Sequence, residues 1–164
     1  MTKIAIVYGT STGATEGVAS QIKDSLGAGD IYDVARVTTQ QLQPYELLIL
    51  GTSTTGYGEI LSDWEDFLPK LETLDFTGKK IALFGLGDSS SYSDTFANGM
   101  SELYKELKDK AEIVGETSAQ GYNFDDSESE VDGKFVGLVI DEENESDQTA
   151  TRIANWTAEL KQYI

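Results

Sequence analysis

The chain has 164 residues, of which 39% are hydrophobic, and this length suits one compact domain with a sizeable core. Twelve basic residues stand against 29 acidic residues, so the formal net charge of −17 disfavours binding to nucleic acid or to anionic lipid. The absence of cysteine and histidine excludes disulfides, zinc sites built on these residues and Ser-His-Asp catalysis, so demanding chemistry needs a bound group.

Short apolar runs alternate with helical segments along the chain. Near-continuous runs, typical of parallel strands buried on both faces, occur at residues 3–9, 30–37, 47–53, 80–87, 112–115 and 135–140. Apolar residues at helical spacing predict helices that include residues 18–26, 96–107 and 153–163. Ser62 and Glu65 predict a capping box that opens a further helix containing Trp64. This alternation predicts an α/β fold with a parallel sheet between helices.

The N-terminal segment predicts a strand rather than the apolar stretch of a secretion signal. No run approaches the roughly 20 apolar residues that span a bilayer. We therefore expect a cytoplasmic protein without membrane insertion, in which residues 1–164 form a single domain.

One polar segment interrupts the alternation. Residues 121–134 separate the runs at 112–115 and 135–140, as though an insertion had split the last strand. Ten carboxylates and one lysine occupy residues 125–147. A solvated acidic face is the ordinary interpretation of such a composition, and a docking surface is the alternative.

Three loops are candidates for a ligand site, because ligands of open parallel sheets bind beyond the carboxyl ends of the strands. Residues 9–15, GTSTGAT, end the first strand and open a helix, and they offer hydroxyl and backbone N–H groups to an anion. Residues 52–59 place glycines on both sides of Tyr57, and residues 85–94 are glycine-rich and carry Tyr92. Together these loops suit a flat phosphorylated ring.

Residues 9–15 also bear on three other loop patterns. The G-x-S-x-G pattern of a hydrolase would make Ser11 a nucleophile, but the chain has no histidine to act as its base. The P-loop pattern fails because no lysine occurs in this segment, and the dinucleotide pattern G-x-G-x-x-G fails as well. A helix start capped by serine or threonine, with no ligand, remains an alternative.

In these motifs the chain resembles a flavodoxin of the long-chain type, over essentially its whole length. The resemblance rests on TSTGAT (residues 10–15), LGTST and GYGE (50–54 and 56–59), DW (63–64), FGLGD and YSD (84–88 and 92–94), and KFVGLVIDEEN (134–144). It implies a flavodoxin-like, doubly wound, five-stranded parallel sheet of order 2-1-3-4-5, with helices on both faces and the last strand split by an insertion. It also implies non-covalently bound FMN where the strand order reverses.

The resemblance further implies which residues hold this cofactor. Phosphate contacts fall on Thr10, Ser11, Thr12, Gly13, Ala14 and Thr15. The loops on the two faces of the isoalloxazine ring fall on Thr54, Thr55, Gly56, Tyr57 and Gly58, and on Leu86, Gly87, Asp88 and Tyr92. Most long-chain members have a tryptophan where this chain has Thr55. Either Tyr57 substitutes for that ring, or the backbone and methyl group of residues 55–56 cover the flavin. No catalytic residue or metal ligand is implied.

The function implied by the resemblance is low-potential one-electron transfer between redox enzymes, through the semiquinone and hydroquinone states of FMN. The expected partners are proteins with basic docking faces, namely a reductase such as a ferredoxin- or flavodoxin-NADP reductase and a downstream electron acceptor. The expected form is a monomer. The alternative is an FMN-dependent quinone or NAD(P)H oxidoreductase of the same fold, which would need a substrate pocket beside the ring.

Overall fold

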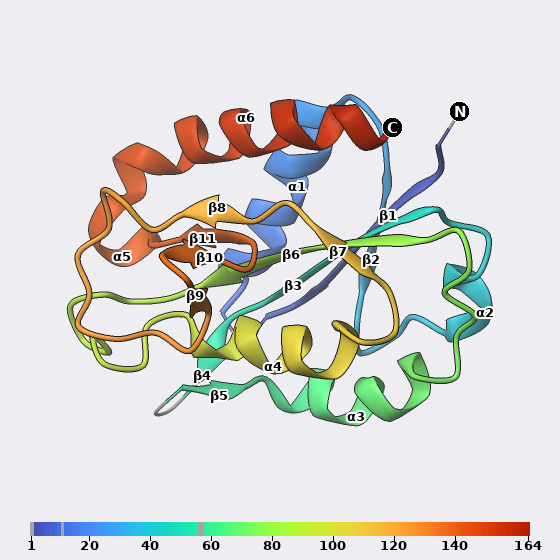
Figure 1. Ribbon diagram of the computed structural model, residues 1–164, viewed down its shortest axis with the longest axis horizontal. Helices are drawn as coiled ribbons and strands as arrows, with labels where there is room; N and C mark the ends of the chain where they lie inside the picture. The colour runs from blue at the N-terminus through green and yellow to red at the C-terminus, as the bar shows by residue number, and fades with distance from the viewer. Residues whose placement is uncertain (1, 11, 56–57) are drawn as a thin grey trace.

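The computed structural model describes residues 2–10, 12–55 and 58–164. Its centre is a parallel sheet in the order β2-β1-β3-β6-β11 (Figure 1). These strands are β1 (Ile4–Gly9), β2 (Asp30–Asp33), β3 (Leu47–Thr52), β6 (Lys80–Leu86) and β11 (Leu138–Ile140). A further strand, β7 (Glu112–Val114), also pairs with β6 in parallel. The predicted order 2-1-3-4-5 is confirmed, with the fifth position shared by β7 and β11.

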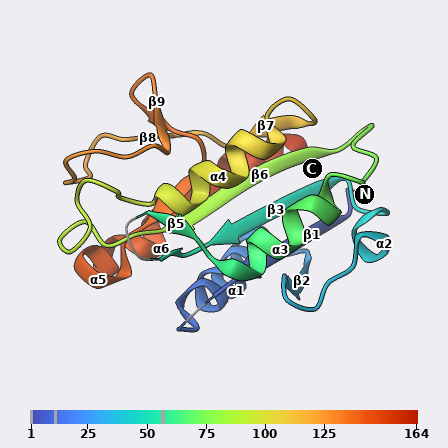
Figure 2. The same ribbon diagram turned by 90° about the horizontal axis from the view of Figure 1, so that it is seen from below.

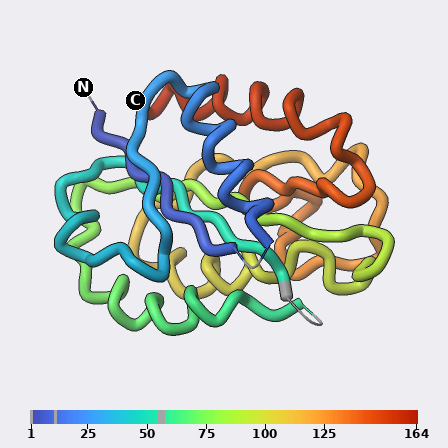
Figure 3. Tube along the Cα trace, turned by 180° about the vertical axis from the view of Figure 1, so that it is seen from behind, coloured from blue at the N-terminus to red at the C-terminus, as the bar shows by residue number. Residues whose placement is uncertain are grey.

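Helices cover both faces of this sheet. On one face α1 (Ala14–Leu26) and α6 (Thr149–Leu160) lie side by side (Figure 3), and the hydroxyls of Ser25 and Thr157 join them at 2.5 Å. On the other face lie α3 (Ser62–Leu71) and α4 (Asn98–Leu107), as Figure 2 shows. The remaining helical segments are short: α2 (Thr39–Leu42), α5 (Glu142–Glu145), η1 (Ser146–Gln148) and η2 (Lys161–Tyr163). None of the helices in the described ranges has both the length and the apolar character that crossing a membrane requires.

The sheet separates two hydrophobic cores. Side chains of a strand alternate between its two faces, and β1 shows the division clearly. Ile4 and Ile6 pack in the core that contains the apolar residues of α1 and α6. Ala5 and Val7 pack in the core that contains those of α3 and α4. Burial on both faces is the reason why the strands are continuous apolar runs rather than alternating ones.

The last sheet position holds two strands in line along one edge of β6. The strand β7 pairs with residues 80–82 of β6, and β11 pairs with residues 84–86. The predicted split is therefore confirmed, but the prediction of one strand over residues 135–140 is wrong. The chain leaves β10 (Lys134–Phe135) and enters β11 through Gly137. A Cβ at Gly137 would lie 2.0 Å from the carbonyl oxygen of Leu83, so only glycine permits this approach.

The segment between β7 and β11 is folded, contrary to the prediction of a polar loop over residues 121–134. Three short strands, β8 (Thr117–Ser118), β9 (Glu130–Val131) and β10, form an antiparallel sheet in the order β8-β10-β9. Tyr122 and Phe124 pack against Phe96 and Phe135, with ring centroids 5.0 to 6.2 Å apart. These aromatic residues are spaced without a regular period among charged residues, which concealed the packing from sequence patterns.

Helix capping also differs from the sequence prediction. The N-cap of α3 is Leu61, and no side chain caps this helix, so the predicted capping box of Ser62 and Glu65 is wrong. A capping box occurs instead at α2, where the side chains and backbone N–H groups of Thr38 and Gln41 bond reciprocally. The helix α3 is held by its apolar face rather than by its cap, since Trp64 is fully buried.

The strand predicted over residues 30–37 ends at Asp33. The carbonyl oxygen of Asp33 accepts hydrogen bonds from the N–H groups of Arg36 and Val37, both at 3.0 Å. Its carboxylate accepts a further bond from the N–H of Ala35 at 2.9 Å. These local bonds close a turn, and they outweigh the β propensity of the following valines.

Glycine packing in β3 leads to a stability prediction. A Cβ at Gly51 would lie 2.0 Å from the ring of Phe84, which is buried, so Gly51→Ala should lower the free energy of unfolding by about 1–3 kcal/mol. A Cβ at Gly17 in α1 meets nothing within 4 Å, and Gly17→Ala should raise that free energy by about 0.5–1 kcal/mol. Urea unfolding of the unliganded protein measures both. A Gly51→Ala variant as stable as the parent would contradict the close packing.

Candidate functional site

Four strands of the sheet end side by side. The register pairs Gly9 with Thr52, Thr52 with Gly85, and Leu86 with Ile140. We call residues 10–15 the first loop, residues 53–58 the second loop and residues 86–92 the third loop. The segments after β3, β6 and β11 gather at the left-hand end of the sheet in Figure 1. The structure thus brings the three predicted loops to one edge of the sheet, which we call the loop edge.

The first loop joins β1 to α1. Thr10 Oγ1 accepts a hydrogen bond from the N–H of Gly13 at 2.8 Å. Gly13 is the N-cap, with φ of 94° and no capping side chain, so the alternative of a helix start capped by serine or threonine is wrong. The N–H of Gly17 donates to the carbonyl of Gly13 at 3.2 Å. The N–H groups of residues 14–16 precede that bond and lie in the first turn of the helix, where free backbone N–H groups can bind an anion.

Thr15 carries the observation that best indicates a ligand. Its side chain is 0% exposed, yet its Oγ1 has no hydrogen-bond partner among the residues that the structure describes. A buried hydroxyl without a partner costs about 1–3 kcal/mol. Thr15 lies in the first turn of α1, beside the N–H groups just described. Residues 9–15 contain no lysine or arginine. This donor set fits a phosphate held by neutral groups. Ser11 lies outside the described residues.

The second loop rests on the beginning of α4. Its strand β4 (Thr54–Thr55) pairs antiparallel with β5 (Glu59–Ile60), which follows the loop, and Thr54 Oγ1 accepts the N–H of Gly99 at 3.0 Å. Gly58 has φ of 91°, and a Cβ there would lie 2.9 Å from the side-chain nitrogen of Asn98. Glycine is therefore required at this position. Gly56, Tyr57 and the side chain of Thr55 lie outside the described part, so the substitution of Tyr57 for a stacking tryptophan stays a prediction.

The third loop is organised by the carboxylate of Asp88. Its Oδ1 accepts the N–H of Ser91 at 3.0 Å and the N–H of Ser90 at 3.1 Å. The bond from the Ser91 backbone is the main cause that lowers the pKa of Asp88 below its usual value. The carbonyl of Asp88 accepts the N–H of Tyr92 at 2.9 Å. Tyr92 is 42% exposed and offers a flat aromatic side chain.

Two glycines bring the sheet close to its covering side chains at the loop edge. A Cβ at Gly9 would lie 2.9 Å from the indole ring of Trp64, and a Cβ at Gly87 would lie 2.8 Å from the ring of Phe96. The indole N–H of Trp64 donates to the carbonyl of Gly51 at 2.8 Å. These contacts explain the glycines that end the apolar runs and place Trp64 in the scaffold rather than among the ligand contacts.

The folded insertion also supports the loop edge, which sequence reasoning missed. The hydroxyls of Ser127 and Ser129 donate to the carbonyls of Phe96 and Ala97 at 2.5 and 2.7 Å, just before α4. Ala97 has a left-handed backbone, with φ of 54°. Asn98 Oδ1 accepts the N–H of Glu128 at 2.8 Å. The second loop therefore rests on a helix start that the insertion holds. A serine that makes such bonds has no signal in sequence that separates it from a solvated serine.

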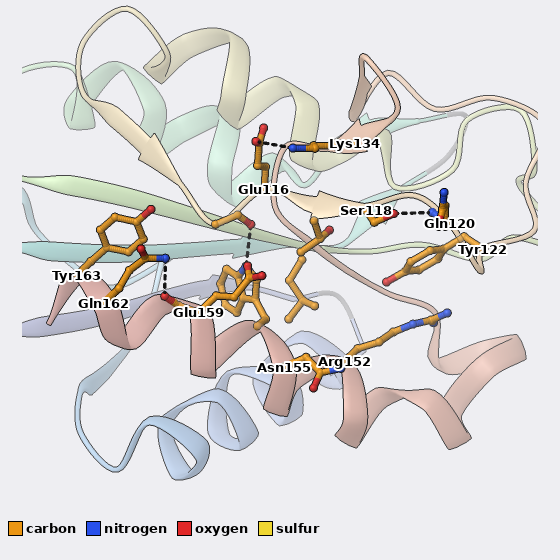
Figure 4. Close-up of a pocket in the computed structure, with 14 residues that line it drawn as sticks. Glu116, Ser118, Gln120, Tyr122, Lys134, Arg152, Asn155, Glu159, Gln162 and Tyr163 are labelled. Atoms are coloured by element: carbon orange, nitrogen blue, oxygen red, sulfur yellow. Dashed lines mark hydrogen bonds and ion pairs between the residues drawn. The ribbon is translucent and has the colours of Figure 1, made fainter.

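A separate cavity of about 620 Å³ lies between α6 and the segment that joins β7 to β8 (Figure 4). Its lining includes Glu116, Lys134 and Arg152, and none of the predicted site residues. Lys134 forms an ion pair with Glu116 at 3.3 Å, and Arg152 forms one with Glu145 at 2.9 Å. The guanidinium carbon of Arg152 also lies 3.8 Å from the ring centroid of Tyr122. Both cationic side chains of the lining form ion pairs, and Arg152 Nη1 is buried without a hydrogen-bond partner among the described residues. We assign no ligand to this cavity.

The strand order and the three loops define a doubly wound α/β protein with its site where the order reverses, between β1 and β3. The flavodoxin family profile matches residues 6–156. The chain is 43% identical over 161 residues to the flavodoxin of Helicobacter pylori, covering 98% of each chain. It is 42% identical over 162 residues to the flavodoxin of Nostoc sp. strain PCC 7120, covering 97% of this chain and 95% of that one.

Structural similarity leads to the same family. The crystal structure of Fusobacterium nucleatum flavodoxin bound to flavin mononucleotide matches with a TM-score of 0.93 and 35% sequence identity, covering 100% of this chain and 99% of that chain. This chain belongs to the flavodoxin family, whose members are electron-transfer proteins rather than enzymes.

The hydroxyl of Thr15 leads to a stability prediction for the unliganded protein. Thr15→Val should raise the free energy of unfolding by about 1 kcal/mol, because it removes an unpaired buried hydroxyl and keeps the shape. Thr52→Val is the matched control: Thr52 is also 0% exposed, but its Oγ1 donates to the carbonyl of Ser53 at 2.8 Å, so stability should fall by about 1 kcal/mol. Equal losses in urea unfolding would show that Thr15 has a partner in the unliganded state.

Proposed function

We propose that this chain binds FMN without a covalent link and acts as a low-potential one-electron carrier between redox enzymes. The observation that carries this proposal is the unpaired, buried hydroxyl of Thr15 at the start of α1, on the loop edge. The match to a flavodoxin whose structure holds flavin mononucleotide supports it. Bound FMN supplies the one-electron redox chemistry, and the protein supplies binding, orientation and electrostatics.

The first loop would hold the phosphate. Its donors are the backbone N–H groups at the start of α1 and the hydroxyls of Thr10, Ser11, Thr12 and Thr15, with Gly13 and Ala14 between them. All of these donors are neutral, so they bind the phosphate while leaving most of its negative charge in place. A charge that is not neutralised opposes the arrival of an electron nearby.

The second and third loops would hold the flavin ring. The proposed contacts are Thr54, Thr55, Gly56, Tyr57 and Gly58 on one face, and Leu86, Gly87, Asp88 and Tyr92 on the other. The seating of Gly58 against Asn98 and the bonds around Asp88 support these assignments, because both loops are held by hydrogen bonds or close packing. The exposed ring of Tyr92 suits an outer stacking partner.

Carboxylates near the loop edge favour a low potential. The helix α3 follows the second loop and has Asp63 and Glu65 in its first turn, and the hydrogen bond from the Ser91 backbone lowers the pKa of Asp88 in the third loop. A unit negative charge about 10 Å from the ring disfavours one added electron by about 0.4–1.7 kcal/mol, for an effective dielectric constant between 80 and 20. Several such charges add to that of the phosphate and make the couple strongly reducing.

The acidic surface also indicates the kind of partner. Glu65 and Asp66 are exposed beside the loop edge, and the net charge of −17 gives the whole surface a negative potential. A reductase or an electron acceptor with a basic docking face would be steered toward such a surface. Reduction of a quinone by NADPH with the purified protein alone would contradict the carrier function and favour the oxidoreductase.

Comparison of FMN with riboflavin tests the phosphate site. The apoprotein should bind FMN at least tenfold more tightly than riboflavin, because the first loop contributes only when a phosphate is present. Thr15→Val should weaken FMN binding by about tenfold and leave riboflavin binding unchanged, since it removes one hydrogen bond to a charged group. Quenching of flavin fluorescence on titration measures both. Equal affinities of the parent protein for the two flavins would contradict the assignment of the first loop.

Salt dependence tests the partner surface. The rate of reduction by a reductase with a basic face should fall as ionic strength rises, because screening limits charge steering to about 8 Å at physiological salt. Glu65→Lys, beside the loop edge, should slow reduction more than the matched reversal Glu130→Lys in the insertion. Stopped-flow kinetics at several salt concentrations measure this difference. Equal effects of the two reversals would contradict docking at the loop edge.

A further inference from the structure

The segment that follows β11 contains a buried carboxylate. Asp141 comes directly after β11 and is 0% exposed. The sequence interpretation placed it in a solvated acidic face over residues 125–147, and for Asp141 that interpretation is wrong. Of the ten carboxylates in that stretch, Asp141 is the one that is buried. Burying a carboxylate is costly unless hydrogen bonds replace the lost water, so its contacts deserve an explanation.

The contacts of Asp141 reach into the third loop. Its Oδ2 accepts the hydroxyl of Ser89 at 2.5 Å and the N–H of Ser89 at 3.3 Å. Its Oδ1 accepts the backbone N–H of Asn144 at 3.2 Å. The side-chain nitrogen of Asn144 also donates to Oδ1 and Oδ2, at 3.0 and 3.2 Å. Among the described ion pairs none includes Asp141, so hydrogen bonds alone compensate its charge.

Asn144 links this carboxylate to that of the third loop. Its side-chain nitrogen donates to Asp88 Oδ1 at 2.8 Å as well as to Asp141. Asp88 in turn holds the N–H groups of Ser90 and Ser91. The start of the third loop is also bonded to the end of β11, since the N–H of Gly87 donates to the carbonyl of Ile140 at 3.0 Å. Residues 87–91 are thus connected, directly or through the side chain of Asp88, to residues 140–144.

Helix capping alone does not account for Asp141. It is the N-cap of α5, which has four residues, and the bond from the Asn144 N–H serves that purpose. A serine or an asparagine would cap the helix as well, without a buried charge. The bonds to Ser89 join two segments that lie 52 residues apart in the chain. They use the second carboxylate oxygen, which the cap does not need.

We propose that Asp141 is a positioning residue that holds the third loop, through Ser89 and Asn144, in the shape that receives the flavin ring. This inference rests on the proposed function, because it assigns the third loop to the ring. A loop that is already ordered before binding loses little conformational entropy when the ligand binds, so the affinity is higher. The charge of Asp141 is useful here because hydrogen bonds to an ionised carboxylate are stronger than those to a neutral amide.

Flavin binding by three variants tests this role. Asp141→Asn should weaken FMN and riboflavin by the same factor, about tenfold or 1.4 kcal/mol, because the third loop faces the ring and not the phosphate. Ser89→Ala should act in the same direction without a change of charge. Glu143→Gln is the matched control: it removes one charge from an exposed position of α5 and should leave both dissociation constants within twofold of the parent.

Hydrogen exchange in the apoprotein provides a readout without flavin. Exchange of the Ser90 and Ser91 amide protons should be faster in Asp141→Asn than in the parent and unchanged in Glu143→Gln.

If Asp141→Asn does not fold, Ser89→Ala tests the proposal by the same measurements. Parent-like flavin constants in a variant that has only lost thermal stability would overturn the proposal. Equal effects of Asp141→Asn and Glu143→Gln would overturn it too, because charge alone would then be responsible. Failure of the parent to bind FMN would overturn the proposed function, and this inference with it.

Discussion

Burial of a parallel sheet on both faces is the constraint on which the rest of this structure depends. Because helices cover each face, strand side chains such as Ile6 and Val7 must be apolar, and polar groups can gather only where strands end. The register places the ends of β1, β3, β6 and β11 next to one another. Three loops from distant parts of the sequence therefore meet at one edge, and their polar groups gather there, beyond the apolar stretches of the strands.

The chemistry of that edge depends on neutral donors among negative charges. The start of α1 offers N–H groups and the hydroxyl of Thr15, without a lysine or an arginine, so an anion can bind there and keep its charge. Carboxylates of α3 and of the third loop surround the same edge. In the proposed function, the neutral donors hold the phosphate of FMN, and the surrounding negative charges make reduction of the flavin difficult.

Two of the three loops are held by segments that follow β7 in the chain. Ser127 and Ser129 of the insertion hold the start of α4, on which Gly58 of the second loop rests. Asp141, after β11, holds the third loop through Ser89. The part of the chain after β7, which contributes no proposed flavin contact, thus makes hydrogen bonds that support two of the loops that do. The carboxylates of residues 125–147 differ in environment: most of them face solvent, and Asp141 is a buried hydrogen-bond acceptor.

The sequence by itself determined the central strands and the loops of the site, because long apolar runs and the glycine-rich segments that follow them are local patterns. The order of the strands came from the family resemblance. Local chemistry misled at Ser62, where packing of Trp64 replaces a cap, and at residues 135–140, where the approach of Gly137 to Leu83 divides an apolar run. Only the tertiary structure decided that Thr15 has an unpaired buried hydroxyl and that Asp141 is buried against Ser89. The physical reason is that burial of a polar side chain depends on partners far away in the chain, and a serine or aspartate has the same local sequence signal whether water or a distant segment satisfies it.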